Sequence, residues 1–302
     1  MGEAGQAGAP SLRILIPLEI NDCRQNTEQV DRRSLVLTSQ RDLLWLNIRE
    51  LPYFRGLMRA VEGRFYQNLP LESPTLDIGC GDGHFAQITF TRKIEIGVDP
   101  WFGPLQEARS RKVYELLLHS YGQNLPIPDE SVASAVSNSV LEHIPDVQPV
   151  LNDISRVLKP GGIFYFCSPN HNFDNALSVA RLLEKIGLRS LARAYRRLFD
   201  RISRHVHLDD PATWTARIEQ AGMKVVRHWN YFSPKSLTRL EWGHYFGLPA
   251  WISKKLFGRW ILTPTRWNLA LTRKVIEPSW QEVQPRDDGV CTFFICQKVE
   301  KP

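Results

Sequence analysis

LDIGCGDGHFAQ, residues 76–87, is the stretch that decides the fold of this chain. An apolar run ends at Ile78, and helix-forming residues resume near His84. The bend between them carries glycine at alternate positions, Gly79, Gly81 and Gly83. Glycine is needed where the backbone turns tightly or where a ligand lies against the main chain, and the first amide groups of a helix have no partner within it. The stretch therefore predicts a strand, a ligand-binding bend and a helix.

Short apolar runs alternate with helical stretches on both sides of this bend. The runs cover residues 75–79, 94–99, 113–120, 132–139, 162–168, 223–232 and 289–299. A helix is expected between the fourth and fifth runs, and the breaker KPGG at 159–162 is expected to end it. Strands that alternate with helices form a mostly parallel sheet, and near-continuous apolar strands fit a sheet that helices cover on both faces. The predicted fold class is therefore α/β.

Composition and pattern divide the chain into six segments. The N-terminal cap is expected to hold two or three helices broken near Pro52, after a Gly- and Ala-rich tail of disordered residues. The expected segments are the tail and helical cap at 1–70, a ligand-binding core at 71–169, a basic helical insertion at 170–210, a core helix and strand at 211–232, an aromatic and basic insertion at 233–288, and a last core strand at 289–302.

The glycine spacing and two acids distinguish between two kinds of nucleotide site. A dinucleotide site uses the pattern GxGxxG and places a pyrophosphate at the helix N-terminus, whereas residues 79–84 supply GxGxG. Asp77 precedes the first glycine by two residues, and Asp99 ends the next strand, where an acid can accept both ribose hydroxyls. S-adenosylmethionine has a cationic sulfonium and no phosphate, so an acid beside the bend favours it. A nicotinamide-dependent oxidoreductase remains the competing hypothesis.

Four ordered blocks carry a resemblance to a known family: LDIGCGDG, IGVDP, NLPIPDESVASAVSNSVLEHIPD and ISRVLKPGGIFYFCSPN. On these blocks, residues 75–170 resemble the class I S-adenosylmethionine-dependent methyltransferases, in the type 11 group related to ubiquinone and menaquinone methyltransferases. The resemblance implies a seven-stranded Rossmann-like sheet with helices on both faces, here with an N-terminal helical cap and two insertions. It also implies methyl transfer, with S-adenosyl-L-methionine as cofactor.

The resemblance assigns cofactor contacts residue by residue. It implies that the amino-acid end of the cofactor lies against Asp77, Gly79, Cys80, Gly81 and Gly83, and that Asp99, followed by Pro100, holds the ribose. Asn138, at the end of the fourth strand, is expected to contact the cofactor amine or the substrate.

Two positions depart from the family's pattern. Ser120-Tyr121-Gly122 replaces an acidic triplet that often touches the adenine amine, and Ser134 replaces a frequent aspartate. The adenine contacts are therefore assigned to Tyr121, Gln123, Asn124 and Leu125. These departures keep open a third hypothesis, in which the protein is a non-catalytic, cofactor-bound scaffold.

Three histidines are the candidates for catalysis. Methyl transfer requires the protein to align the nucleophile, exclude water and, for a hydroxyl, remove a proton. His143 follows the fourth strand, where ligands of open α/β sheets bind, and it either contacts the reacting groups or fixes the loop. His205 and His207 stand where the chain returns from the first insertion, as a general base or as ordinary surface residues. Two ligands in an HxH pattern are insufficient for a metal site, and no metal is expected.

Both insertions bear on the acceptor and on partners. Residues 181–204 contain eight Lys or Arg and two acids, and Leu188, Leu191, Tyr195, Leu198 and Ile202 form one helical stripe. This segment is either a cap helix packed on the core with its basic face in water, or a lid that binds an anionic headgroup or membrane surface. Residues 233–288 hold five of the nine tryptophans, which fill a small core, line a pocket or meet lipid headgroups.

We expect the methyl acceptor to be a small molecule or a lipid-like compound. Oxygen is the expected acceptor atom, with carbon or nitrogen as alternatives. The net charge of +6 is a mild basic excess without an RNA-binding motif, so no nucleic acid partner is expected.

Cysteine usage and hydropathy bear on the compartment. The five cysteines form no zinc pattern, and Cys291 and Cys296 should point to opposite faces of a strand. The N-terminus lacks the features of a signal peptide, and no apolar run approaches the roughly 18 residues of a membrane span. A cytoplasmic protein that meets membranes only peripherally is therefore expected.

Overall fold

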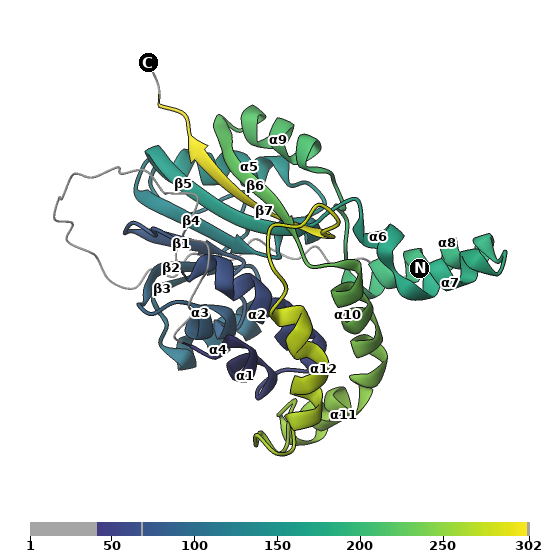
Figure 1. Ribbon diagram of the computed structural model, residues 1–302. Helices are drawn as coiled ribbons and strands as arrows, with labels where there is room; N and C mark the ends of the chain where they lie inside the picture. The colour runs from purple at the N-terminus through teal and green to yellow at the C-terminus, as the bar shows by residue number, and fades with distance from the viewer. Residues whose placement is uncertain (1–40, 68, 301–302) are drawn as a thin grey trace, which may run out of the picture.

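The computed structural model describes residues 41–67 and 69–300, and its centre is a sheet of seven strands (Figure 1). The strand order across the sheet is β3-β2-β1-β4-β5-β7-β6. Only β7 runs antiparallel to its neighbours β5 and β6. The strands are β1 (Thr75–Ile78), β2 (Ile94–Asp99), β3 (Tyr114–His119), β4 (Val132–Asn138), β5 (Leu158–Pro169), β6 (Met223–Tyr231) and β7 (Cys291–Lys298). The α/β fold with a seven-stranded sheet is confirmed.

Helices cover both faces because successive strand residues point to opposite sides. On β5, Tyr165 packs toward the helices α2, α3 and α4, whereas Phe164 packs toward α5 and α9. Cys291 and Cys296 lie in these two separate apolar clusters, so the prediction of opposite faces is confirmed. The helices named are α2 (Tyr53–Tyr66), α3 (His84–Thr89), α4 (Phe102–Arg111), α5 (Gln148–Val157) and α9 (Pro211–Gln220).

The KPGG segment is part of a strand, which differs from the expectation that β5 begins at residue 162. The helix α5 ends at Val157, and β5 starts at the next residue. Pairing between β4 and β5 passes from Val132–Leu158 to Ser134–Ile163, so β5 holds three more residues than β4 between these pairs. Gly161, at φ +74°, provides the left-handed backbone that this bulge requires.

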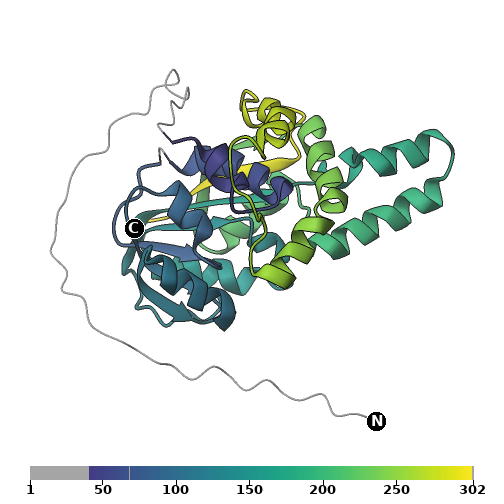
Figure 2. The same cartoon turned by 90° about the horizontal axis from the view of Figure 1, so that it is seen from below.

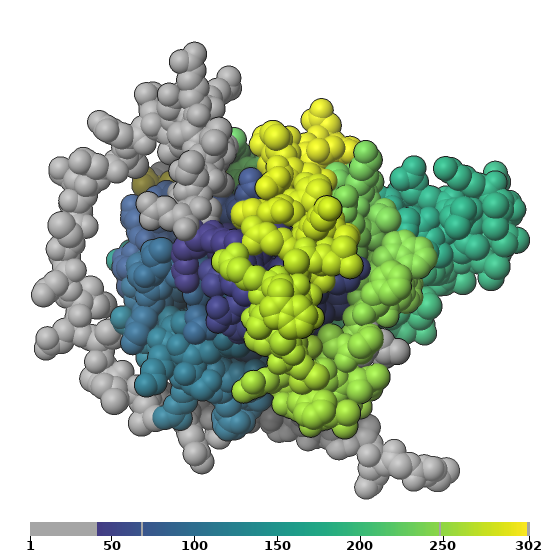
Figure 3. All heavy atoms as spheres, turned by 60° about the horizontal axis from the view of Figure 1, so that its bottom comes forward, coloured from purple at the N-terminus to yellow at the C-terminus, as the bar shows by residue number. Residues whose placement is uncertain are grey.

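The first helices of the described chain lie over the part of the sheet where the glycine bend follows β1. α1 (Leu43–Ile48) and α2 are separated at Pro52, as expected; residues 12–40 of the expected cap, the tail and Cys23 lie outside the described residues. α10 (Pro234–Phe246) and α12 (Ala270–Trp280) pack against α2, and Figure 3 shows segment 234–280 covering these helices. This third layer closes one side of the cleft described below.

The insertion at 170–210 does not pack on the sheet as a cap. It folds into α6 (Phe173–Ala176), α7 (Ser178–Lys185) and α8 (Arg189–Ser203), and the last two form a hairpin that extends away from the body (Figures 1 and 2). Of α8, only Ala192 and Phe199 are buried. The helix prediction is therefore confirmed, but most of its apolar stripe remains in solvent.

The tryptophans of the second insertion do not fill a core of their own. Trp242, Trp251 and Trp267 are exposed, the second of them on α11 (Leu248–Phe257). Trp214 on α9 is instead the tryptophan that packs fully, against Phe166 and Phe294. No described helix is long and apolar enough to cross a bilayer.

Trp214→Ala tests this core. Removing a fully buried indole leaves a cavity, and we expect it to lower the free energy of unfolding by about 3–5 kcal/mol. Trp267→Ala is the matched control, because Trp267 is 76% exposed and its removal is expected to cost no more than about 0.5 kcal/mol. Urea titration followed by circular dichroism measures both; equal losses would contradict this packing.

Candidate active site

The bend after β1 requires glycine at both of its ends. Gly79 has φ +74°, and a Cβ there would meet the Val140 side chain at 2.5 Å. Gly83 has φ +70°, begins α3, and a Cβ there would lie 3.2 Å from Ala108. At Gly81, between them, a Cβ would find nothing closer than 4.0 Å, so the middle of the bend is open. The predicted strand, bend and helix are confirmed.

Asp99 fixes the bend from the neighbouring strand. Its Oδ2 accepts a hydrogen bond from the backbone N–H of Gly81 and its Oδ1 from that of Trp101, both at 2.9 Å. The side chain is 6% exposed. Each carboxylate oxygen keeps a further lone pair, so the group can still accept the two hydroxyls of a ribose.

Asp77, the other acid of the bend, faces the cleft from β1. It accepts a hydrogen bond of 2.6 Å from the Tyr114 hydroxyl. Burial raises the pKa of Asp77 to about 7, and the negative charge of Asp99 acts in the same direction, whereas the hydrogen bond opposes both. A neighbouring cation would favour the ionised form.

A cleft of about 920 Å³ opens beside this bend. Segments far apart in the chain form its walls: α2, the glycine bend, the end of β4, the base of α8, and α10 with the loop after α11. Phe54, Met58, Phe173, Trp251 and Trp260 supply apolar surface, while charged or polar walls come from Arg55, Arg59, Glu62, Asp77, Asn138, Glu142, His143, Arg204 and His205.

Glu62 is the cleft residue that the sequence analysis missed. It accepts hydrogen bonds from Asn138 Nδ2 at 2.8 Å and from the hydroxyls of Ser139 and Tyr231 at 2.9 Å. Burial raises its pKa. The sequence feature that could have indicated Glu62 is an acid beside the apolar positions of α2.

Asn138, predicted to contact the cofactor amine or the substrate, lines the cleft but directs its amide to Glu62.

His143 and His205 come together in one wall of the cleft, with their rings nearly parallel and their centres 5.9 Å apart. Nδ1 of His143 lies 3.0 Å from the carbonyl oxygen of Arg204; a carbonyl can only accept, so Nδ1 carries the proton and Nε2 keeps a lone pair. Burial lowers the pKa of His143, and burial together with His143 lowers that of His205 to about 3. Both imidazoles are therefore neutral at pH 7.

His207 is not brought to this wall. Its Nε2 bonds the carbonyl oxygen of Ile144 at 2.9 Å, and its Nδ1 lies 3.2 Å from Asp209 Oδ2. The residue is absent from the cleft lining. Both ring nitrogens thus hold the loop after α8, whereas the sequence left open a general base or an ordinary surface residue.

The Oε2 atom of the buried Glu142, beside His143, has no hydrogen-bond partner among the described residues. Burial raises the pKa of Glu142 well above its ordinary range. A neutral carboxyl of this kind can donate a proton as well as accept one.

The predicted adenine contacts lie in the loop after β3, which begins beside Asp99 at the end of β2. Tyr121 is exposed, and so are Trp101 and Phe102, which the sequence analysis did not select. The backbone N–H of Leu125 donates to Asp153 and that of Asn124 to the carbonyl oxygen of Tyr121, so within this group the backbone N–H groups of Tyr121 and Gln123 have no partner among the described residues. Pro100 directs its carbonyl oxygen to His119.

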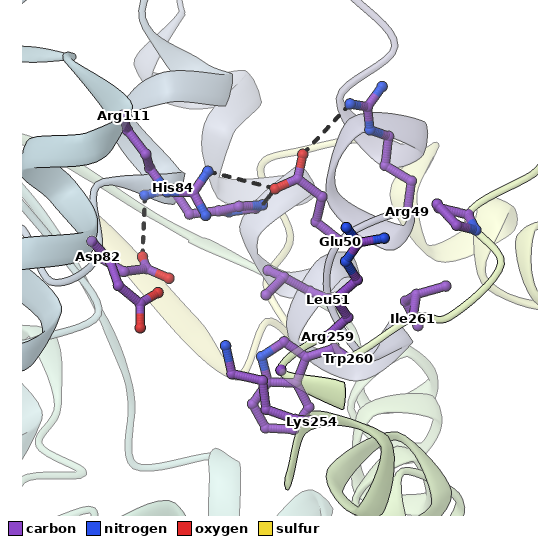
Figure 4. Close-up of a pocket in the computed structure, with 13 residues that line it drawn as sticks. Arg49, Glu50, Leu51, Asp82, His84, Arg111, Lys254, Arg259, Trp260 and Ile261 are labelled. Carbon is purple, nitrogen blue, oxygen red and sulfur yellow. Dashed lines mark hydrogen bonds and ion pairs between the residues drawn. The ribbon is translucent and has the colours of Figure 1, made fainter. Parts of the chain in front are cut away.

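A second cavity of about 760 Å³ adjoins the bend on its outer side (Figure 4). Glu50 lies at its centre and pairs with Arg49, Arg111 and His84 at 3.5–3.6 Å. Trp260 lines both this cavity and the cleft. No group of three or more His, Cys, Asp or Glu within 41–67 and 69–300 is arranged to hold a metal ion.

Comparison with known proteins supplies the family of the core. Residues 76–166 match a family model described as a methyltransferase domain. This part of the chain is a methyltransferase domain. A methyltransferase domain replaces the nicotinamide-dependent oxidoreductase as the interpretation of the glycine bend, and S-adenosylmethionine is the cofactor in the name of one relative reported below.

Relatives of the methyltransferase domain share only part of their length with this chain. A malonyl-[acyl-carrier protein] O-methyltransferase of Yersinia pestis is 37% identical over 92 residues, 30% of this chain and 34% of its own. A probable S-adenosylmethionine-dependent methyltransferase of Mycolicibacterium smegmatis is 34% identical, over 32% of this chain and 37% of its own. The chain thus spans about a third of the length of these relatives.

A solved structure extends the likeness of fold beyond the domain. The geranyl diphosphate C-methyltransferase of Streptomyces coelicolor superposes with a TM-score of 0.50 at 12% identity, covering 89% of each chain. At this identity the likeness concerns the fold alone.

The residues present fit the cofactor on their chemistry. The open glycine bend offers backbone against which a ligand can lie, Asp77 can ionise beside a sulfonium or ammonium group, and Asp99 retains acceptors for a ribose. The exposed rings of Trp101 and Tyr121 offer apolar faces for adenine at the same strand ends.

The pKa of Asp77 generates a prediction for cofactor binding. Below about pH 7 its carboxyl is neutral, and above that value it is an anion that attracts the sulfonium. Affinity for S-adenosylmethionine should therefore rise as the pH rises through this pKa, and Asp77→Asn should remove the rise and weaken binding about tenfold, or ~1.4 kcal/mol, at alkaline pH. Calorimetry on both proteins measures this; identical pH profiles would contradict the assignment.

Proposed function

We propose that this protein transfers the methyl group of S-adenosylmethionine to an oxygen atom of an amphipathic, lipid-like acceptor. The observation that carries the proposal is the His143 imidazole in the cleft wall: its Nδ1–H is committed to the Arg204 carbonyl, and its Nε2 lone pair remains. A hydroxyl acceptor bound in the cleft must lose its proton as it is methylated, and such a base can accept it.

His143 would act by accepting the proton that the acceptor oxygen loses as it attacks the methyl carbon. The carbonyl of Arg204 fixes its tautomer and its orientation. Because burial lowers its pKa, the imidazole is neutral and competent at pH 7, and it is lost as a base only in more acidic solution. Glu142 Oε1 lies 3.8 Å from its Nε2 and the His205 ring stacks beside it, while 39% of the His143 side chain stays exposed.

The walls of the cleft support an acceptor with both apolar and anionic parts. Phe54, Phe173 and Trp251 offer apolar surface. Arg55 lies with its guanidinium 5.8 Å from the centre of the Trp260 ring and forms no ion pair with any described carboxylate. Burial and the positive charge of Arg59 lower the pKa of Arg55 to about 10, so Arg55 remains a cation at pH 7. An acceptor carboxylate or phosphate would compensate that charge.

His143→Ala tests the base. We expect kcat to fall about 10²- to 10⁴-fold while the affinity for S-adenosylmethionine stays unchanged, because the residue touches the acceptor side of the cleft. His207→Ala is the matched control: both of its ring nitrogens are engaged outside the cleft, so its kcat should remain near that of the wild type. An unaltered rate in His143→Ala, or equal losses in both variants, would refute the assignment.

Labelled methyl transfer to an extract of lipids and small molecules tests the acceptor. The label should enter a product that partitions into organic solvent, attached through oxygen; hydriodic acid releases methyl iodide from a methyl ether or ester but not from a C-methyl product. Arg55→Gln should lower the yield at limiting acceptor about tenfold and recover at saturation, as expected for a lost charge contact. A C-methyl or N-methyl product would reject the oxygen assignment.

A further inference from the structure

The α7–α8 hairpin leaves apolar side chains in solvent along one side. Leu191, Leu198 and Ile202 of α8 are each about half exposed, at 54%, 49% and 48%. Their spacing of seven and four residues places them on one line along the helix. The buried residues Ala192 and Phe199 lie on the adjoining line, so α8 buries only one edge of its apolar stripe. The other edge has no protein partner in the described chain.

The exposed edge of α8 continues onto α10. Tyr195, one turn from both Leu191 and Leu198, bonds the hydroxyl of Tyr245 at 2.7 Å. The buried carboxylate of Glu241 accepts from Tyr195 and from the start of α7 at Ser178, and it thereby fastens the hairpin to α10. We use the term hairpin face for the surface that results, formed by Leu191, Leu198, Ile202, Trp242, Tyr245 and Phe246, which are 43–68% exposed.

Cations occupy the side of α8 that faces away from its exposed leucines, as their spacing along the helix requires. The exposed arginines Arg193, Arg197 and Arg201 follow the solvent side of α8 and form no ion pair or hydrogen bond with any described residue. The hairpin as a whole, residues 181–204, carries eight Lys or Arg against two acids. One of those acids, Glu184, is already paired with Arg196 at 2.7 Å. The result is an amphipathic helix with an apolar line on one side and uncompensated positive charge on the other.

We propose that the hairpin face docks on the surface of an anionic lipid bilayer. Leucine and isoleucine side chains would enter the boundary between headgroups and acyl chains, while the arginines would contact lipid phosphates. Trp242 and Tyr245 have the apolar body and polar end that suit this interface; the Trp242 indole N–H already donates to Ser178 Oγ at 3.1 Å. The docked molecule lies on the membrane and does not cross it.

Charge and chemistry favour lipid over other occupants. A second copy of the chain, docked face to face, would bring together two hairpins that each carry eight Lys or Arg against two acids, and their repulsion would stay uncompensated. A nucleic acid would meet the arginines but would leave the leucine and phenylalanine side chains in water. A bilayer with anionic headgroups satisfies both halves of the surface at once.

The base of the same helix leads to the candidate active site. Ile202, Ser203 and Arg204, at the end of α8, line the cleft that also contains His143. A bilayer bound along the hairpin therefore lies next to the cleft. This docking does not depend on which acceptor is methylated, and a lipid-like acceptor would gain a short path into the cleft.

Vesicle binding by the full chain tests the proposal. The protein is sedimented with vesicles of phosphatidylcholine alone, or of phosphatidylcholine with phosphatidylglycerol, at low and high salt. We expect binding to the anionic vesicles, at least about tenfold weaker binding to the neutral ones, and weakening by salt. The hairpin variants are Leu191→Ser with Leu198→Ser, and Arg197→Gln with Arg201→Gln. Each pair should reduce binding to anionic vesicles about tenfold or more.

Matched controls separate docking from a general effect of the substitutions. Leu271→Ser removes an exposed leucine of α12, and Arg109→Gln removes an exposed arginine of α4; neither should alter vesicle binding. Calorimetry with S-adenosylmethionine should give wild-type affinity for every variant, which shows that each is folded. This readout also distinguishes failure of the docking from failure of the proposed methyl transfer.

Three results would overturn the proposal. The first is absence of binding to anionic vesicles, and the second is equal binding to both vesicle types. The third is a wild-type dimer in solution that the leucine pair converts to a monomer, because the hairpin face would then be an interface between two copies.

Discussion

The hydrogen bonds from Gly81 and Trp101 to the two oxygens of Asp99 hold the glycine bend against the neighbouring strand. Without them the bend would be a flexible turn, because glycine restricts its own backbone least. With them, the loop stays open over β1 and β2, and the carboxylate is oriented before any ligand arrives. The cleft, the acids beside it and the start of α3 all take their positions from this constraint.

The rest of the cleft is assembled from segments that are distant along the chain. Helix α2 contributes Glu62, which Asn138 and Tyr231 bind from two different strands. The chain returning from the hairpin bonds through Val206 and His207 to the backbone of Glu142, which places His205 against His143. The methyltransferase domain thereby receives walls of its cleft from the cap and from the two insertions.

The hairpin obeys a different physical rule from the core. Inside the sheet domain, apolar residues at strand or helix spacing are buried, whereas the stripe on α8 has the same spacing and is half exposed. The polar anchors at its base, centred on the buried Glu241, account for the difference: they hold the hairpin outward without burying its leucines. An exposed surface of this kind is typical of proteins with a further contact to make.

The sequence by itself determined the sheet, the glycine bend and the placement of Asp77 and Asp99, because these depend on local backbone demands and on residues adjacent to strand ends. Boundaries were less exact: KPGG proved to be a bulge in β5, since pairing with β4 outweighed the local tendency to break. Only the tertiary structure selected Glu62 for the cleft, separated His143 and His205 from His207, and left the stripe of α8 in solvent. Helical spacing shows that residues share a face, but which face is covered depends on contacts between distant segments; Glu62 and Tyr231, for example, are 169 residues apart.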